Sequence, residues 1–289
     1  MTNLFDIIKV SGSDARSFLQ GQLTQDVTRL GNALDVVPSL PAAWCNAKGR
    51  VIAVLRVLAG DDGEIALVVP AALAEHLVKR FFMYRFRANV DFAIAGDEWS
   101  ALAVTAEDDL AAAAALGLLP QNAGNPARAG GLIAVDIGAE PRCIEVYGPT
   151  AAYRQSRLAF SRPLTDVEWR LALIRAGSPL IEAATSEKYT PHMLNLDRLG
   201  AVSFRKGCYT GQEVVARTEH LGSSKRRLMR FRTEGAHAAV ADKLRHGERD
   251  VGEVVNAVGE ELLAVVPVEL HGQALEVHGA AAQPVALPY

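Results

Sequence analysis

The feature that most constrains the fold is an irregular alternation of helical and extended segments over the first three quarters of the chain. Apolar residues at helical spacing predict a helix that Ser13 caps, and further helices over 70–86, 108–119, 150–158 and 166–176. Extended runs predict strands over 34–45, 50–59, 64–69, 90–95, 101–105, 132–137 and 143–147. Short strands mixed irregularly with helices predict an α+β fold, and no GxGxxG motif supports a dinucleotide-binding sheet.

From residue 222 onward the helical periodicity disappears. Short strands separated by glycine-containing turns are expected over 228–232, 251–258, 262–268, 274–277 and 285–287. A region made only of short strands predicts a small β-barrel or sandwich domain over 222–289, after an α+β body over 1–221.

Composition and charge bound the function. A formal net charge of -3 gives no overall attraction to nucleic acid or to an acidic membrane. No signal peptide is visible, and the apolar tract Leu110–Leu119 is too short to span a bilayer. Cys45, Cys143 and Cys208 form no CxxC pair, and the first two are expected to be structural. We expect a reduced, cytoplasmic protein with no metal site visible in the sequence.

The segment Phe204–Arg217, FRKGCYTGQEVVAR, contains the residues with the strongest indication of chemistry. Gly207 and Gly211 predict a tight backbone around Cys208 and Tyr209, because glycine is favoured where φ is positive or another group approaches closely.

A helix is expected to begin just after Cys208. Thr210 and Glu213 have the spacing of a capping box, and Arg205 and Lys206 precede the cysteine. A helix N-terminus and nearby cations both favour the thiolate, so Cys208 is the candidate reactive thiol.

The same residues also have structural interpretations. Cys208 could fill a turn, Tyr209 could pack in the core, and Glu213 could act only as a cap. Lys206 could be a solvated surface residue. As site residues, Tyr209 and Gln212 would contact a ligand, although Gln212 could instead face solvent.

Lys206–Glu213, KGCYTGQE, resembles the signature of the YgfZ-type folate-binding proteins, which are bacterial relatives of mitochondrial iron–sulfur assembly factors. Pro191–Asp197, Phe18–Val27 and Asn46–Arg50 also resemble segments of this family, so the resemblance covers nearly the whole chain. The family is similar in fold to the T-protein of the glycine cleavage system, an aminomethyltransferase that uses tetrahydrofolate.

The resemblance implies two interleaved ferredoxin-like halves around a folate cavity, divided near 32–98, and a C-terminal β-barrel. It implies tetrahydrofolate or a polyglutamylated derivative as cofactor, and iron–sulfur enzymes or assembly proteins as partners. Support of tRNA modification would then be indirect, through such an enzyme. Cys208 would be the essential thiol, with Lys206 beside it, and the sequence leaves open whether the thiol attacks, ligates or senses.

Basic residues concentrate between Arg198 and Arg232, where nine Lys and Arg residues accompany two acidic ones, a local charge of +7. An alternating strand with a solvated face accounts for several of them. The functional interpretation is an anion site, with Arg217 and Arg226 as candidate ligands for phosphate or for the glutamate tail of folate. Direct RNA binding is disfavoured because aromatic residues do not interleave with the basic ones.

The chain departs from the T-protein pattern at the positions where T-proteins carry an acidic pair. Here these positions are Ala53 and Val54. With no carboxylate there, no group is expected to assist aminomethyl transfer. The accessory folate-binding role is therefore favoured over the alternative, a folate-dependent one-carbon transferase.

Overall fold

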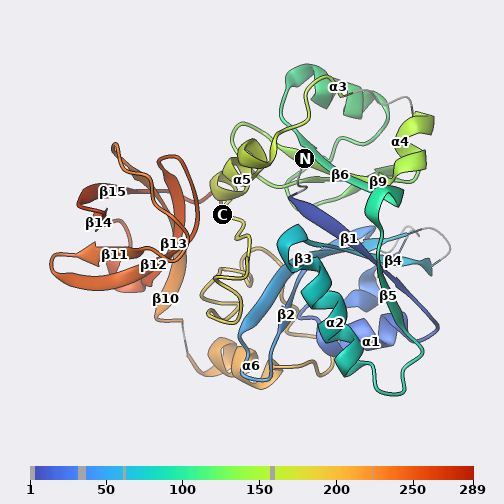
Figure 1. Ribbon diagram of the computed structural model, residues 1–289, viewed down its shortest axis with the longest axis horizontal. Helices are drawn as coiled ribbons and strands as arrows, with labels where there is room; N and C mark the ends of the chain where they lie inside the picture. Colours follow the sequence, from blue (N-terminus) through green and yellow to red (C-terminus); the bar gives the residue numbers. More distant parts are fainter. Residues whose placement is uncertain (1–3, 32–36, 61–62, 157–159, 223) are drawn as a thin grey trace.

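The computed structural model describes residues 4–31, 37–60, 63–156, 160–222 and 224–289. Two antiparallel sheets pack against each other, and a closed β-barrel lies beside them (Figure 1). No helix in these ranges combines the length and the apolar character needed to cross a bilayer.

The first sheet has the strand order β2-β3-β4-β1-β5. Its strands are β1 (Phe5–Ser11), β2 (Ser39–Cys45), β3 (Val51–Ala59), β4 (Ile65–Pro70) and β5 (Asp91–Ile94). Helices α1 (Ala15–Gln22) and α2 (Ala74–Tyr84) share a hydrophobic core with one face of this sheet. In that core the ring of Phe81 stacks on Trp44, with centroids 3.9 Å apart, and on Phe92, with centroids 4.9 Å apart.

The second sheet has the order β6-β9-β8-β7. Its strands are β6 (Trp99–Val104), β7 (Ala127–Ala129), β8 (Leu132–Asp136) and β9 (Ile144–Pro149), accompanied by α3 (Glu107–Ala115), α4 (Thr150–Ser156) and α5 (Asp166–Arg175). One apolar cluster joins Ile7 and Leu58 of the first sheet to Ile133, Val135 and Tyr147 of the second. The two sheets therefore face each other.

A long irregular stretch, 177–211, leads from α5 to α6 (Gln212–Leu221) and then to the barrel. The barrel strands are β10 (Arg226–Thr233), β11 (Lys243–His246), β12 (Arg249–Val258), β13 (Glu261–Pro267), β14 (Leu275–Val277) and β15 (Ala280–Val285). They close in the order β10-β13-β12-β11-β14-β15, which leaves no open sheet edge. Cys45, Leu194, Val215 and Leu263 belong to one hydrophobic cluster, so the irregular stretch and α6 connect the first sheet to the barrel.

The predicted fold class is confirmed, and the C-terminal region is a barrel rather than a sandwich. Three strands were not predicted: the central strand β1, and the short strands β7 and β11. The last strand lies at 280–285 rather than 285–287. Residues 34–36 and 157–158, within a predicted strand and a predicted helix, lie outside the described residues.

The predicted cap of the first helix is wrong. Asp14, not Ser13, occupies the N-cap position of α1, and it makes no side-chain capping bond. Instead its carboxylate accepts a hydrogen bond from the backbone N–H of Asn89 at 2.7 Å, which ties the helix start to the chain just before β5.

Candidate functional site

The signature segment, Lys206–Glu213, is anchored by the side chain of Lys206. Its ammonium group donates hydrogen bonds to the backbone carbonyls of Gln20, Leu23 and Gln25 at 2.6, 2.7 and 2.9 Å. These carbonyls lie at and just after the end of α1, where helix carbonyls lack intrahelical partners. Burial lowers the pKa of Lys206 to about 8. All three ammonium protons are used, so none is left for Cys208.

Two glycines bring the signature segment against the turn that joins β2 to β3. Gly211 has φ +82°, and a Cβ there would lie 2.4 Å from the carbonyl oxygen of Asn46. Gly49 has φ +67°, and its Cβ would lie 2.8 Å from the Cβ of Val214. The predicted tight backbone is confirmed at Gly211 and is wrong at Gly207, which has open space beside it and no positive φ.

The predicted capping box at Thr210 and Glu213 is wrong. Helix α6 begins at Gln212 with Gly211 at its N-cap, so Thr210 lies too early to cap it. The Thr210 hydroxyl is 3.4 Å from Oε1 of Gln22, and Glu213 pairs with Arg217 one turn along the helix at 2.6 Å.

The same spacing does form a capping box elsewhere. Thr165 and Glu168 cap α5 reciprocally. The contact of Gly211 with the β2–β3 turn sets the start of α6 one residue later than the side-chain spacing predicts.

The three cysteines differ sharply in accessibility. Cys208 is exposed, whereas Cys45 and Cys143 are buried. Burial raises the pKa of Cys45 to about 12, and it raises the pKa of Cys143 as well. Cys208 is therefore the thiol that solvent and reagents reach.

The neighbouring site candidates have different environments. Tyr209 is buried, its ring centroid lies 5.1 Å from the Lys206 ammonium, and burial raises the pKa of its hydroxyl. Gln212 is half-buried at the first turn of α6, and Arg217 is exposed. Tyr209 therefore has a packing role, and the Arg217 guanidinium is engaged with Glu213.

Much of the basic segment is paired within the protein. Arg226 donates hydrogen bonds to the carbonyls of Val251 and Val265 at 2.9 and 3.2 Å, both in the barrel. Arg230 binds Glu261 at 2.5 Å. These two arginines, predicted as part of an anion site, are therefore engaged within the barrel.

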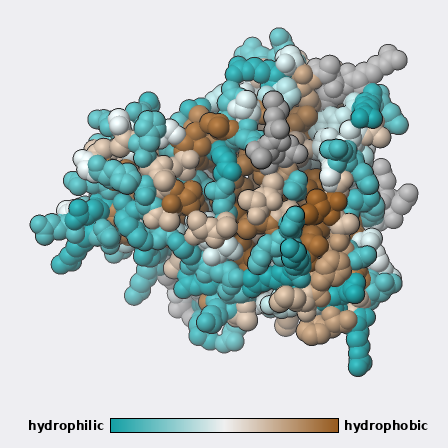
Figure 2. Space-filling model, in the orientation of Figure 1, coloured by the Kyte–Doolittle hydropathy of each residue, from teal (hydrophilic) through white to brown (hydrophobic). Residues whose placement is uncertain are grey.

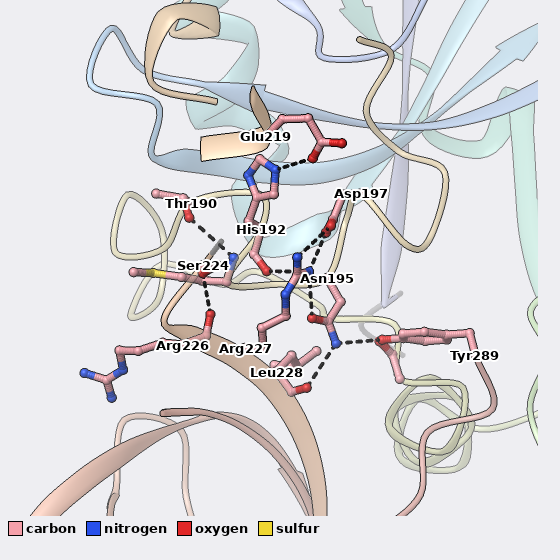
Figure 3. Close-up of polar contacts among 12 residues, drawn as sticks. Thr190, His192, Asn195, Asp197, Glu219, Ser224, Arg226, Arg227, Leu228 and Tyr289 are labelled. Carbon is pink, nitrogen blue, oxygen red and sulfur yellow. Dashed lines mark hydrogen bonds and ion pairs between the residues drawn. The ribbon is translucent and has the colours of Figure 1, made fainter. Parts of the chain in front are cut away.

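The segment 190–197 joins α6 to the barrel, as Figure 3 shows. Nε2 of His192 lies 3.1 Å from a Glu219 carboxylate oxygen, and Arg227 donates to both carboxylate oxygens of Asp197 at 2.8 and 2.9 Å. Asn195 donates to a backbone carbonyl of β10. His192, Asp197 and Glu219 lie close enough together to share a cation, but the Arg227 guanidinium already neutralises Asp197. We assign this cluster to packing.

A cavity of about 320 Å³ lies where the two sheets, α5 and the irregular stretch meet. Its wall is mostly apolar, and its volume is typical of a small-molecule site. The wall also contains a few polar side chains: Arg56, Asp136, Glu145, Tyr147, Ser178, Arg198 and Tyr289.

Glu145 is the buried carboxylate of this cavity, with 3% of the residue exposed. One oxygen accepts a hydrogen bond from the Tyr147 hydroxyl at 2.5 Å, and the other accepts one from Nε1 of Trp169 at 2.8 Å. Nε of Arg56 lies 3.9 Å away. Burial, and next the Glu145 charge, raise the pKa of Tyr147, which keeps its phenol a donor. A carboxylate has about four acceptor positions, so Glu145 retains capacity for a ligand.

Asp136 and Arg198 complete the polar wall. Asp136 is buried and accepts hydrogen bonds from the backbone N–H of Gly138 at 2.9 Å and from Nε of Arg142 at 2.7 Å. Arg198 is exposed, and it is the one member of the basic segment that lines this cavity.

Two carboxylates line the cavity, although the positions of the T-protein acidic pair carry none in this chain. Val54 does line the cavity and Ala53 packs in the first core, so neither supplies an acid. Glu145 of β9 and Asp136 of β8 supply two carboxylates from the opposite sheet. The available signal was a glutamate inside an otherwise apolar strand, Ile144–Tyr147.

None of the signature residues lines the cavity. The link between them is the Thr24 side chain and the adjacent backbone carbonyl of Gln25. The Thr24 hydroxyl donates to the carbonyl of Ala201, a wall residue, at 2.6 Å, while the carbonyl of Gln25 accepts from Lys206. The signature segment therefore supports the cavity wall without facing the ligand space.

Comparison with known proteins gives relatives along most of the chain. The chain is 33% identical over 260 residues to the tRNA-modifying protein YgfZ of Klebsiella pneumoniae, covering 89% of this chain and 77% of that one. It is 34% identical over 258 residues to the tRNA-modifying protein YgfZ of Shigella dysenteriae, covering 86% and 77%. No family model matches the chain.

A solved structure has the same fold. The glycine cleavage system aminomethyltransferase T of Bartonella henselae aligns with a TM-score of 0.73 at 19% identity, covering 99% of this chain and 84% of that one. The T-protein-like fold expected from the sequence is confirmed.

Proposed function

The chain belongs to the family of the tRNA-modifying protein YgfZ, and from this premise we propose that it is a tetrahydrofolate-binding accessory protein for iron–sulfur enzyme assembly or repair. Its support of tRNA modification would be indirect, through such an enzyme. Folate binding is proposed on the basis of the cavity between the two sheets, with the buried Glu145 in its wall.

The cavity has the chemistry that a reduced folate requires. A pterin ring is flat and presents N–H donors along one edge, which suits the free acceptor capacity of Glu145 between apolar walls. The glutamate tail is anionic, which suits the exposed guanidinium of Arg198. When bound, a reduced folate supplies or accepts a one-carbon unit, whereas the protein positions it and excludes water.

The iron–sulfur part is supported by the signature segment. It presents Cys208, an exposed thiol, on a backbone that Lys206 and Gly211 hold in place. A thiolate is a soft ligand and a nucleophile, and both properties suit a protein that contacts metal–sulfur clusters.

Calorimetry with tetrahydrofolate tests the folate part. Glu145→Gln removes the charge and keeps the shape, and it is expected to weaken binding by about tenfold or more. Glu213→Gln, the same change on the exposed face of α6, should leave binding unchanged. Wild-type protein that binds no tetrahydrofolate would overturn the assignment of the cavity.

The assignment of Arg198 to the glutamate tail of folate has its own test. Polyglutamylated folate should bind more tightly than the monoglutamate at low salt, and Arg198→Gln should remove that preference. Equal affinity of the wild-type protein for both forms would contradict the role of Arg198.

A second candidate, a folate-dependent one-carbon transferase, is favoured by the two carboxylates in the cavity. A buried Glu145 could act as a general base or acid toward a folate nitrogen. The accessory role predicts no release of methylene-tetrahydrofolate from an aminomethyl-loaded carrier. Robust turnover that Glu145→Gln abolishes would establish the transferase instead.

A further inference from the structure

Exposed apolar side chains gather at one place on the surface of the body. Among the large apolar residues in the described ranges, those exposed on α2 and on the segment through β5 are Phe82, Met83, Phe86 and Ile94, with 38, 71, 88 and 39% of each residue exposed. The other exposed large apolar residues, such as Leu116 and Val167, belong to other elements. Figure 2 shows apolar residues gathered on the face that α2 and β5 present.

Helix α2 packs on β5, and we call these four exposed residues the α2–β5 patch. Phe82 contacts Phe92 of β5, with ring centroids 5.5 Å apart. Ile94 lies two residues beyond Phe92 and so on the same face of the strand. Met83 and Phe86 follow Phe82 at the end of α2.

The backbone conformation of Phe86 is unusual for an aromatic residue. Its φ is +46°, in the left-handed region that bulky side chains rarely adopt, and the residue is almost fully exposed. Strain of this kind concentrates at functional sites.

Charged residues of both signs lie beside the patch, including the exposed Asp91 and Arg87. Arg85 lies over the ring of Phe82 at 5.1 Å, pairs with Asp91 at 3.8 Å, and donates a hydrogen bond to the carbonyl of Val90 at 3.4 Å. Arg87 is exposed, and among the described residues it has neither an ion pair nor a side-chain hydrogen bond. The Arg87 guanidinium can therefore donate hydrogen bonds to a carboxylate from outside, whereas Arg85 is engaged within the chain.

We propose that the α2–β5 patch docks a partner protein through a segment that combines an apolar anchor with a nearby Asp or Glu. The proposal rests on the proposed accessory role, because an accessory protein must contact the enzyme that it serves. Phe, Met and Arg are the residue types enriched in protein–protein interfaces. Met83 and Ile94 are aliphatic and offer no face for base stacking, so the composition favours a protein over RNA.

Photo-crosslinking in cells tests the proposal. p-Benzoylphenylalanine replaces Phe86 in one variant and Val167, an exposed apolar residue of α5, in the control. The position 86 variant should give a discrete protein adduct absent from the control, with the cross-link in an apolar segment containing Asp or Glu. Adding Arg87→Glu or Met83→Ser should lower the yield by about tenfold.

Other outcomes would overturn the docking proposal. An adduct of twice the chain's mass would indicate a second copy of this chain, and an adduct sensitive to ribonuclease would indicate RNA. Equal adducts at positions 86 and 167, no adduct at all, or a yield unaffected by Arg87→Glu would also contradict it. Calorimetry of the same position 86 variant with tetrahydrofolate separates the two proposals. Loss of folate binding by wild-type and variant alike refutes the cofactor, whereas intact binding without an adduct refutes the docking surface alone.

Discussion

The ammonium group of Lys206 lies 2.7 Å from the carbonyl oxygen of Leu23, although the two residues are 183 positions apart in the chain. This contact and the two beside it place a buried cation against the end of α1. The side chain that the sequence places next to the candidate thiol is turned inward, and its charge holds the loop that carries Cys208.

Replacement of Lys206 should therefore be costly to the fold. Lys206→Met keeps the length and apolar stem of the side chain but leaves three carbonyls without their donor. We expect the free energy of unfolding to fall by about 2–4 kcal/mol. Urea unfolding followed by tryptophan fluorescence measures it. Arg205→Met, at the exposed preceding residue, is the control, and an equal loss in both variants would refute the anchoring role.

Gly211 and Gly207 allow a matched comparison within the signature segment. Gly211→Ala adds a Cβ 2.4 Å from the carbonyl oxygen of Asn46 at a positive φ, and it should cost about 1–3 kcal/mol. Gly207→Ala adds a Cβ into open space and should be nearly neutral. Thermal unfolding of the two variants measures this difference in stability. Equal unfolding temperatures would show that the contact with the β2–β3 turn does not exist.

The stability of the contact between the barrel and the body should depend on pH, because Glu253 takes part in it. Glu253 accepts hydrogen bonds from Lys188 at 2.9 Å and Tyr189 at 2.7 Å, which precede the barrel in the chain, and from Lys243 of β11. Burial alone would raise its pKa, but these partners lower the pKa to about 2. A lowered carboxyl pKa adds stability that is fully present above the ordinary value of 4.5 and is lost as pH falls toward 2.

Glu253→Gln should accordingly lower the free energy of unfolding by about 1–3 kcal/mol at pH 7. The difference in free energy of unfolding between wild type and variant should shrink as the pH falls from 4.5 to 2, because the wild-type carboxylate becomes protonated in that range. Glu269→Gln, at an exposed barrel residue, should show no such gap. A gap that stayed constant down to pH 2 would mean that the charge of Glu253 contributes nothing.

The sequence predicts the fold well where one period dominates a segment. The nearly continuous apolar runs of β3 and β13 and the apolar stripe of α2 each identify their element. Strand β1 lies between β4 and β5, and its burial follows no simple alternation, so it gave no strand signal.

The candidate site was only partly predictable, and for a physical reason. The signature marks Cys208 and Gly211, but the sequence carries no trace of the contact between Lys206 and the end of α1. The cavity is still less visible, because its wall brings together residues as distant as Phe5, Glu145 and Arg198. Only packing of the two sheets places them around one space.

The final prediction concerns the chemistry of the three thiols. Alkylation requires an accessible thiolate, and Cys208 is the exposed one, whereas burial raises the pKa of Cys45 and of Cys143. Iodoacetamide should therefore label Cys208 first, and Cys208→Ser should abolish the fast phase. Mass spectrometry of digested protein at successive times measures each site. Faster labelling of either buried cysteine would show that the body opens more readily than its packing indicates.

Accessibility alone does not establish a function, so the same variant must be tested in cells. Serine is nearly isosteric with cysteine, and Cys208 is exposed, so Cys208→Ser should unfold at the wild-type temperature. It should nevertheless fail to restore iron–sulfur enzyme activity in cells that lack the protein, because only the sulfur chemistry is lost. Normal unfolding with lost rescue assigns the role to the thiol itself. Full rescue would instead show that the signature acts through the backbone that Lys206 and Gly211 hold, with Cys208 filling a turn.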